Sequence, residues 1–124
     1  MKNKKINGEL KELMNEKGNV CVSVIIPLHS QPSDQEIDWI NVDHVFEKAK
    51  TLLNSKKKPA LNETLLKKLT MLRNKIRFAE GASGVGTFVS PNVARLIYFP
   101  FPIAEKVVTG RSFETRDVMY KELS

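Results

Sequence analysis

Side chains suited to catalysis or metal binding are few in this sequence. The two histidines, His29 and His44, and the single cysteine, Cys21, are the residues that best bind a transition metal or act as a base or nucleophile. Their spacing matches no metal-binding pair such as Cys-x-x-Cys or His-x-Glu, and no serine lies in a Gly-x-Ser-x-Gly turn. We therefore expect no catalytic residues, no metal and no cofactor, and we interpret the protein as non-enzymatic.

The glycine-rich segment 81–86 is a second place where chemistry could occur, because glycine loops can expose backbone N–H groups to a phosphate. A nucleotide-binding loop of that kind lies between a strand and a helix and contains a Lys-Ser/Thr pair. Here a helical pattern precedes the glycines and a strand pattern follows them. The segment instead predicts a turn at the end of a helix, where glycine adopts positive φ.

Positive charge is the feature that suggests a function. The net charge is +6, and residues 48–77 contain ten basic residues and one acid, Glu63. Cations gathered on one face attract RNA phosphates by releasing counterions. A solvated, soluble helix face would show the same composition, so both interpretations stay open. The candidate RNA-binding residues are Lys48, Lys50, Lys56, Lys57, Lys58, Lys67, Lys68, Arg73, Lys75 and Arg77.

The overall composition is that of a globular protein, with 41% hydrophobic and 27% charged residues. The longest apolar run, residues 24–28, is far shorter than a membrane span, and no signal-peptide pattern follows the N-terminal lysines. A single cysteine in an apolar strand pattern indicates a buried thiol in a reducing compartment. We predict one cytoplasmic domain over residues 1–124, with an N-terminal helix in 1–18 and a core in 19–123.

Hydrophobic periodicity predicts the elements that must position the basic residues. Residues 8–17 predict a short helix, 19–28 a strand covered on both faces, and 37–54 and 62–80 two helices that form a hairpin. Asn62 is the expected N-cap of the second hairpin helix. The apolar stripe predicted for the first hairpin helix consists of Ile37, Ile40, Val42, Val45, Phe46, Ala49, Leu52 and Leu53, with Trp39 at its side.

The last third of the chain changes to the two-residue period of strands. Residues 85–89, 93–99 and 103–109 predict three strands in a mostly antiparallel meander. Residues 114–123 predict a short closing helix, with a strand as the alternative. Tyr98, Phe99 and Phe101 either form an exposed aromatic ledge or alternate into the core. The expected fold is α/β (α+β), with a single mixed, mostly antiparallel sheet of about four strands. A helical hairpin is inserted after the first strand, and terminal helices flank the sheet.

Several short phrases resemble one protein family. The strand that closes in proline, residues 21–27, is similar to the first strand of the N-terminal domain of archaeo-eukaryotic peptide-release factors. The phrases Phe88-Val89-Ser90-Pro91 and Phe99-Pro100-Phe101-Pro102, and the later residues 112–115, most resemble the bacterial branch of that superfamily. The resemblance covers roughly residues 19–123. It implies an α/β domain that takes part in translation.

Two motifs of release factors do not occur in this sequence, namely Asn-Ile-Lys-Ser, which reads codons, and Gly-Gly-Gln, which promotes ester hydrolysis. The resemblance therefore implies ribosome or RNA binding rather than peptide release. Our leading hypothesis is a non-catalytic module that binds the ribosome or RNA through the basic hairpin, with a further domain or protein as another candidate partner. The alternative is a protein-interaction or structural domain, such as a dimer formed through an exposed strand edge.

Overall fold

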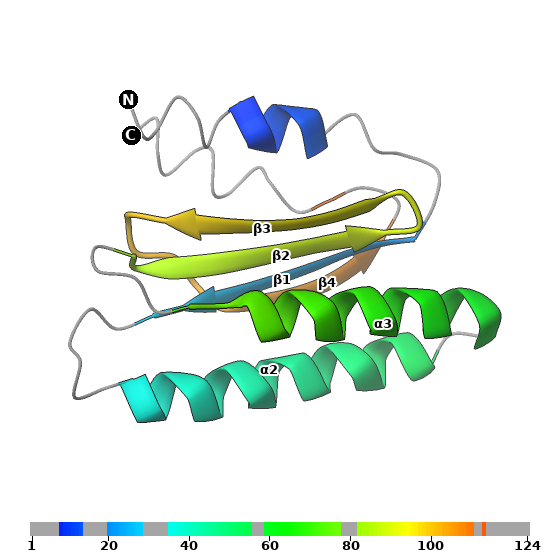
Figure 1. The fold of residues 1–124 in the computed structure, drawn as a ribbon, viewed down its shortest axis with the longest axis horizontal. Coiled ribbons are helices and arrows are strands. Elements are labelled where there is room, and N and C mark those ends of the chain that lie inside the picture. The colour runs from blue at the N-terminus through cyan, green and yellow to red at the C-terminus, as the bar shows by residue number, and fades with distance from the viewer. Residues whose placement is uncertain are drawn as a thin grey trace.

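The computed structural model describes residues 8–13, 20–28, 35–55, 59–77, 82–110 and 113. They form three layers, in which a four-stranded sheet separates a helical hairpin from a short N-terminal helix (Figure 1). The strands are β1 (Cys21–Pro27), β2 (Gly84–Ser90), β3 (Val93–Phe99) and β4 (Lys106–Gly110), and the hairpin helices are α2 (Gln35–Asn54) and α3 (Pro59–Lys75). The predicted fold class is confirmed.

Strand β1 lies inside the sheet and is covered on both faces, as its nearly continuous apolar sequence predicts. The strand order is β3-β2-β1-β4, and every neighbouring pair is antiparallel. Val22, Val24 and Ile26 pack against the hairpin, whereas Cys21 and Ile25 pack against the opposite layer. Cys21 has no exposed surface, which confirms that it is a buried thiol.

The predicted meander is wrong in its last strand, because β4 pairs with β1 and not with β3. Pairing with β4 gives β1 a partner along its second edge, so the most apolar strand is not left at the edge of the sheet. The connection from β3 crosses over the start of β2, where a Cβ on Gly84 would lie 2.3 Å from Ile103 Cδ1. Ile103 is therefore part of the crossover, and the strand predicted from residue 103 begins at Lys106.

The glycines of β2 are extended strand residues and not a helix-terminal turn. Gly84 is where the crossover passes, and a Cβ on Gly86 would lie 2.8 Å from the ring of Phe88. Their small size allows close packing, and neither has a positive φ. Gly81, where the turn was also predicted, lies outside the described residues.

The hairpin covers one face of the sheet, with α2 packed on β1 and β4 and α3 on β2 and β3 (Figure 1). Helix α3 begins at Pro59, a residue suited to the first turn, and so Asn62 is not its N-cap. The buried Asn62 side chain instead donates a 2.8 Å hydrogen bond from Nδ2 to the Leu53 carbonyl at the end of α2. This bond satisfies one of the carbonyls that a helix C-terminus leaves open.

The first turns of α2 face differently from the predicted stripe. Ile37 and Ile40 are 59% and 65% exposed, whereas Asp38 is buried in line with Val42 and Val45. The buried positions recur at the i, i+4, i+7 spacing that starts from Asp38, and this spacing places the two isoleucines on the outer side. The predicted core positions from Val42 to Leu53 are otherwise confirmed, with Leu52 only half-buried.

The other layer begins with residues 8–13, which are helical as predicted (Figure 1). Leu10 and Leu13 from this helix pack with Phe88, Ile97 and Phe113 on the second face of the sheet. The rest of the predicted helix 8–17 and all of the predicted helix 114–123 lie outside the described residues.

Candidate nucleic-acid interface

The structure describes seven of the ten candidate RNA-binding residues, and Lys56, Lys57 and Lys58 lie outside the described residues. All seven are on α3, just after it, or on the second half of α2. Their surroundings divide them into cations paired with acids, cations bound to the fold, and two exposed cations at the end of α3.

Three lysines form ion pairs with carboxylates. Lys48 lies 3.2 Å from Glu105, in the crossover to β4, and Lys50 lies 3.4 Å from Glu47 on the same helix. Lys67 lies 3.5 Å from Glu63. Such exposed pairs add little stability, but each carboxylate lowers the positive potential near its lysine. The charge counted along residues 48–77 therefore overstates the local charge, because Glu47 and Glu105 come from outside that segment.

Arg73 joins the two helices of the hairpin. Its Nε donates a 2.7 Å hydrogen bond to Asp43 Oδ1, and its guanidinium lies 4.5 Å from the centre of the Trp39 ring. Trp39 is half-buried, so it lies beside the core as predicted and also supports a cation. Arg73 is therefore engaged in holding α2 against α3.

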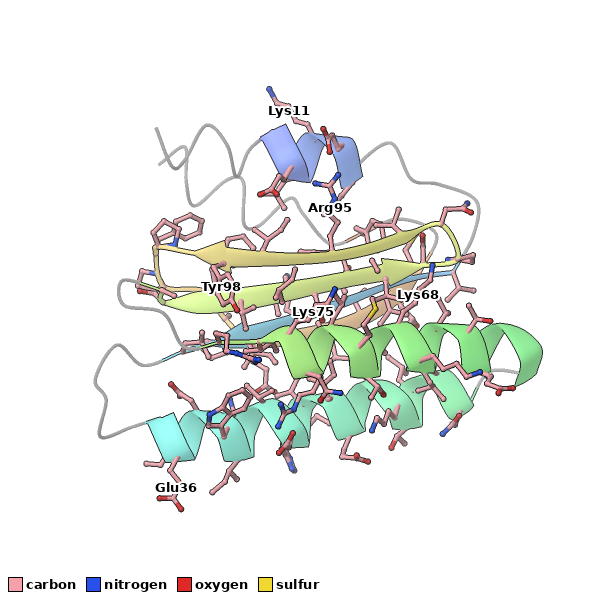
Figure 2. The ribbon with its side chains drawn as sticks, in the orientation of Figure 1. Lys11, Glu36, Lys68, Lys75, Arg95 and Tyr98 are labelled. Atoms are coloured by element: carbon pink, nitrogen blue, oxygen red, sulfur yellow. The ribbon has the colours of Figure 1, made fainter. Side chains whose placement is uncertain are left out.

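Lys68 is bound to the fold in another way. Its ammonium group donates to the carbonyl oxygens of Ser90 and Pro91 at 2.8 and 2.7 Å, at the turn between β2 and β3. Figure 2 shows the side chain at the boundary between α3 and the sheet. A lysine with two such bonds positions the turn and has one ammonium hydrogen left for a ligand.

Lys75 and Arg77 are the exposed cations at the end of α3. Arg77 donates from Nη1 to the carbonyls of Asn74 and Ile76, at 3.0 and 2.8 Å, and its backbone N–H donates to the Tyr98 hydroxyl at 2.7 Å. Neither cation has an acidic partner within the part of the chain that the structure describes. The ammonium group of Lys75 and the remaining N–H groups of the Arg77 guanidinium, on Nε and Nη2, are available to an anionic ligand.

The two aromatic residues of β3, Tyr98 and Phe99, alternate between the two layers, so they do not form an exposed ledge with Phe101. Phe99 is buried against the N-terminal layer and contacts Phe101 in a tilted arrangement, with 5.7 Å between ring centroids. Tyr98 points to the hairpin side and is half-buried there. The sequence alone did not place Tyr98 beside Arg77, because that position depends on the contact between α3 and β3.

Of the residues considered for catalysis, the two that the structure describes, His44 and Cys21, do not come together. His44 is exposed on the outer side of α2, and Cys21 is buried in β1, while His29 lies outside the described residues. Among the residues that the structure describes, no three histidine, cysteine or acidic side chains are placed to hold a metal ion. Nor does any helix in the described ranges have the length and hydrophobicity needed to cross a bilayer.

Comparison with known proteins identifies the fold. No protein-family model and no curated protein matches the sequence. The solved structure of an archaeal translation termination factor, aRF1, matches with a TM-score of 0.65 and 16% identity over 98% of this chain. A structure described as an archaeal protein matches with a TM-score of 0.63 and 16% identity over 96% of the chain. In both cases the chain spans 35% of the matched structure, so about a third of its length. The chain has a release-factor-like fold.

Proposed function

We propose that the protein is a translation-associated module that binds the ribosome or RNA and has no catalytic activity of its own. The observation that carries the proposal is the fold, which matches a translation termination factor over 98% of the chain. The sequence phrases around Phe88–Pro91 and Phe99–Pro102 support a place in the bacterial branch of the same superfamily. A cytoplasmic location is part of this proposal.

The proposed activity is binding alone, because the release-factor motifs Asn-Ile-Lys-Ser and Gly-Gly-Gln do not occur in the sequence. We assign the binding to cations that have no acidic partner among the described residues, or no acid close to them in the sequence. These are Lys75 and Arg77 at the end of α3 and the lysines of the connector between α2 and α3, Lys56, Lys57 and Lys58, which have no acid between Lys48 and Asn62. Phosphate contacts of this kind supply affinity without reading sequence.

The experiment is co-sedimentation of the full chain with purified bacterial ribosomes over a range of salt concentrations. We expect binding at about 50 mM salt that weakens steeply towards about 200 mM, because counterion release drives it. In the control, a protein complex of low net charge that is similar in size to the ribosome takes the place of the ribosomes. Failure to sediment with ribosomes at low salt, together with failure to bind ribosomal RNA, would overturn the proposal.

A second candidate function is protein interaction. Ile37 and Ile40 are large apolar side chains exposed on the outer side of α2, and β3 and β4 are the edges of the described sheet. Exposed apolar residues and strand edges both allow association with another protein. Sedimentation equilibrium tests this candidate: a mass that rises with concentration, in a chain that binds neither RNA nor ribosomes, would favour it over the first proposal.

A further inference from the structure

On one side of the hairpin, the described residues combine exposed cations with apolar surface and include no acid. We call it the α3–β3 flank and define it by Lys68, Met71, Lys75, Arg77, Leu96 and Tyr98. Lys68 faces the turn between β2 and β3 through its two hydrogen bonds, and Met71 and Lys75 follow it on the same side of α3 at i+3 and i+7. Figure 2 shows Lys68, Lys75 and Tyr98 along the boundary between α3 and the sheet.

Among the residues that the structure describes, the positive charge of this flank has no acid beside it. Strands β2 and β3 and the turn between them, residues 84–99, contain no acid, and the one acid of α3, Glu63, lies in its first turns and pairs with Lys67. The C-terminus of α3 contributes only about half a negative charge. Lys75 and Arg77 together exceed this, so the end of the flank attracts anions.

Apolar surface lies next to these cations. Met71 is 41% exposed, and Leu96 and Tyr98, on the edge strand β3, are half-buried on the hairpin side. The hydrogen bond from the Arg77 backbone to the Tyr98 hydroxyl fixes the start of the Arg77 side chain beside the ring. Single-stranded nucleic acid offers both phosphates for such cations and base or sugar surfaces for such apolar groups.

An acidic peptide fits this region less well than RNA. A peptide that paired with the edge of β3 would place alternate side chains on the two faces of the sheet. On the second face Arg95 is already bound to Glu9 and Glu12, with N–O distances of 3.7 and 2.7 Å. Half of the acidic side chains would therefore meet carboxylates, which repel them. A ligand that needs cations on the hairpin side only avoids this repulsion.

We propose that the α3–β3 flank binds the backbone of single-stranded RNA, with Lys75 and Arg77 on phosphates and Tyr98 and Met71 against a nucleotide. This inference rests on the proposed function and assigns RNA binding to the α3–β3 flank. A shallow hollow on the outer side of the hairpin, between α2 and α3, is a different surface. That hollow is lined by Lys50, Glu63, Leu66, Lys67 and Thr70, where both lysines are paired with acids.

The test compares two double variants that remove the same charge. Lys75→Gln/Arg77→Gln removes the two exposed cations at the end of α3. Lys50→Gln/Lys67→Gln removes two cations that form ion pairs with acids. Each protein is titrated with labelled oligouridine of about 12 nucleotides at several salt concentrations. We expect the slope of log K against log salt to fall by about 1.4 for the first variant, at about 0.7 per phosphate contact, and to change much less for the second.

Lys75→Gln alone controls for a loss of folding, because this side chain is exposed and its substitution breaks no hydrogen bond that holds the described fold. We expect it to reduce the slope by about 0.7. A circular dichroism spectrum matching that of the wild type confirms the fold of each variant.

Three results would overturn the inference. If both double variants lose affinity equally, the effect is that of net charge and the flank has no special role. If the wild type sediments with ribosomes but binds no oligouridine, the flank inference fails while the proposed function survives. If a polyglutamate peptide of about 12 residues binds as tightly, and Lys75→Gln/Arg77→Gln abolishes that binding, the partner is an acidic protein segment.

Discussion

The guanidinium of Arg73 lies over the ring of Trp39, 4.5 Å from its centroid, and joins α3 to α2 on the outer side of the hairpin. The same guanidinium bonds to Asp43 at 2.7 Å. Arg73 is thus restrained from two directions, by stacking over the indole ring and by its hydrogen bond to the Asp43 carboxylate. The hairpin that presents the remaining cations is thus held partly by one of the residues predicted to bind RNA.

We expect Arg73→Ala to lower the free energy of unfolding by about 1–2 kcal/mol, because it removes both the stacking on Trp39 and the bond to Asp43. Arg73→Lys should recover only part of this loss, since an ammonium group cannot stack as a planar guanidinium does. Urea denaturation measures both values. Lys67→Ala, in an exposed pair, is the control and should change the stability by less than about 0.5 kcal/mol. Equal effects of Arg73→Ala and Lys67→Ala would show that the stacked arrangement adds no stability.

A second prediction concerns the crossover from β3 to β4. Gly84→Ala should destabilise the fold by about 1–3 kcal/mol, because the new methyl group would overlap the Ile103 side chain. Gly84→Ala/Ile103→Val, which shortens the opposing side chain, should recover part of the loss. Gly8→Ala is a matched control, since a Cβ there meets nothing within 4 Å. Thermal unfolding compares the variants, and an unchanged melting temperature for Gly84→Ala would refute the close approach at Ile103.

The buried thiol of Cys21 gives a third prediction. Cys21 has no exposed surface in β1, so a thiol reagent should react with the native protein slowly and with the urea-unfolded protein rapidly. The native rate should follow the fraction of molecules that open. A native rate equal to the unfolded rate would mean that β1 is not covered in solution.

The sequence predicted most of the helices and strands from local hydrophobic spacing, although the N-cap at Asn62 and the turn at Gly84 were wrong. The continuous apolar run of β1 and the helical spacing from Val42 to Leu53 depend on neighbours in the chain, and both are confirmed. The position of β4 was missed because β4 pairs with β1, a strand that is distant in the sequence. A local pattern does not show which strand has an edge left to pair. The predicted apolar stripe of α2 wrongly included Ile37 and Ile40, because hydrophobicity alone does not show that Asp38 lies in line with the core positions.

The candidate site was predicted as a set of residues but not as a surface. Lys48 is paired with Glu105, 57 residues further along, and Arg73 with Asp43, 30 residues earlier, so no local count of charge could show that these cations are neutralised. The same distance in sequence hid the position of Tyr98 beside Arg77, which only the packing of α3 on β3 reveals. Sequence could identify where cations are abundant, and the fold determines which of them stay exposed.

The central claim is that the protein binds ribosomal RNA through cations of the hairpin, and the salt dependence of that binding tests it most directly. Lys56→Gln/Lys57→Gln/Lys58→Gln removes the connector lysines and should weaken binding by a similar factor for all RNA sequences, because phosphate contacts read no bases. Lys4→Gln/Lys5→Gln/Lys11→Gln removes the same number of charges near the N-terminus, where acids are close in sequence, and is the control.

The measurement is the slope of log K against log salt for ribosomal RNA binding by the wild type and both triple variants. We predict that the connector variant has a slope smaller than that of the wild type by about 2, at about 0.7 per lost contact, and that the N-terminal variant stays close to the wild type. No binding by the wild type at low salt, or the same loss in both triple variants, would contradict the claim and favour the protein-interaction function.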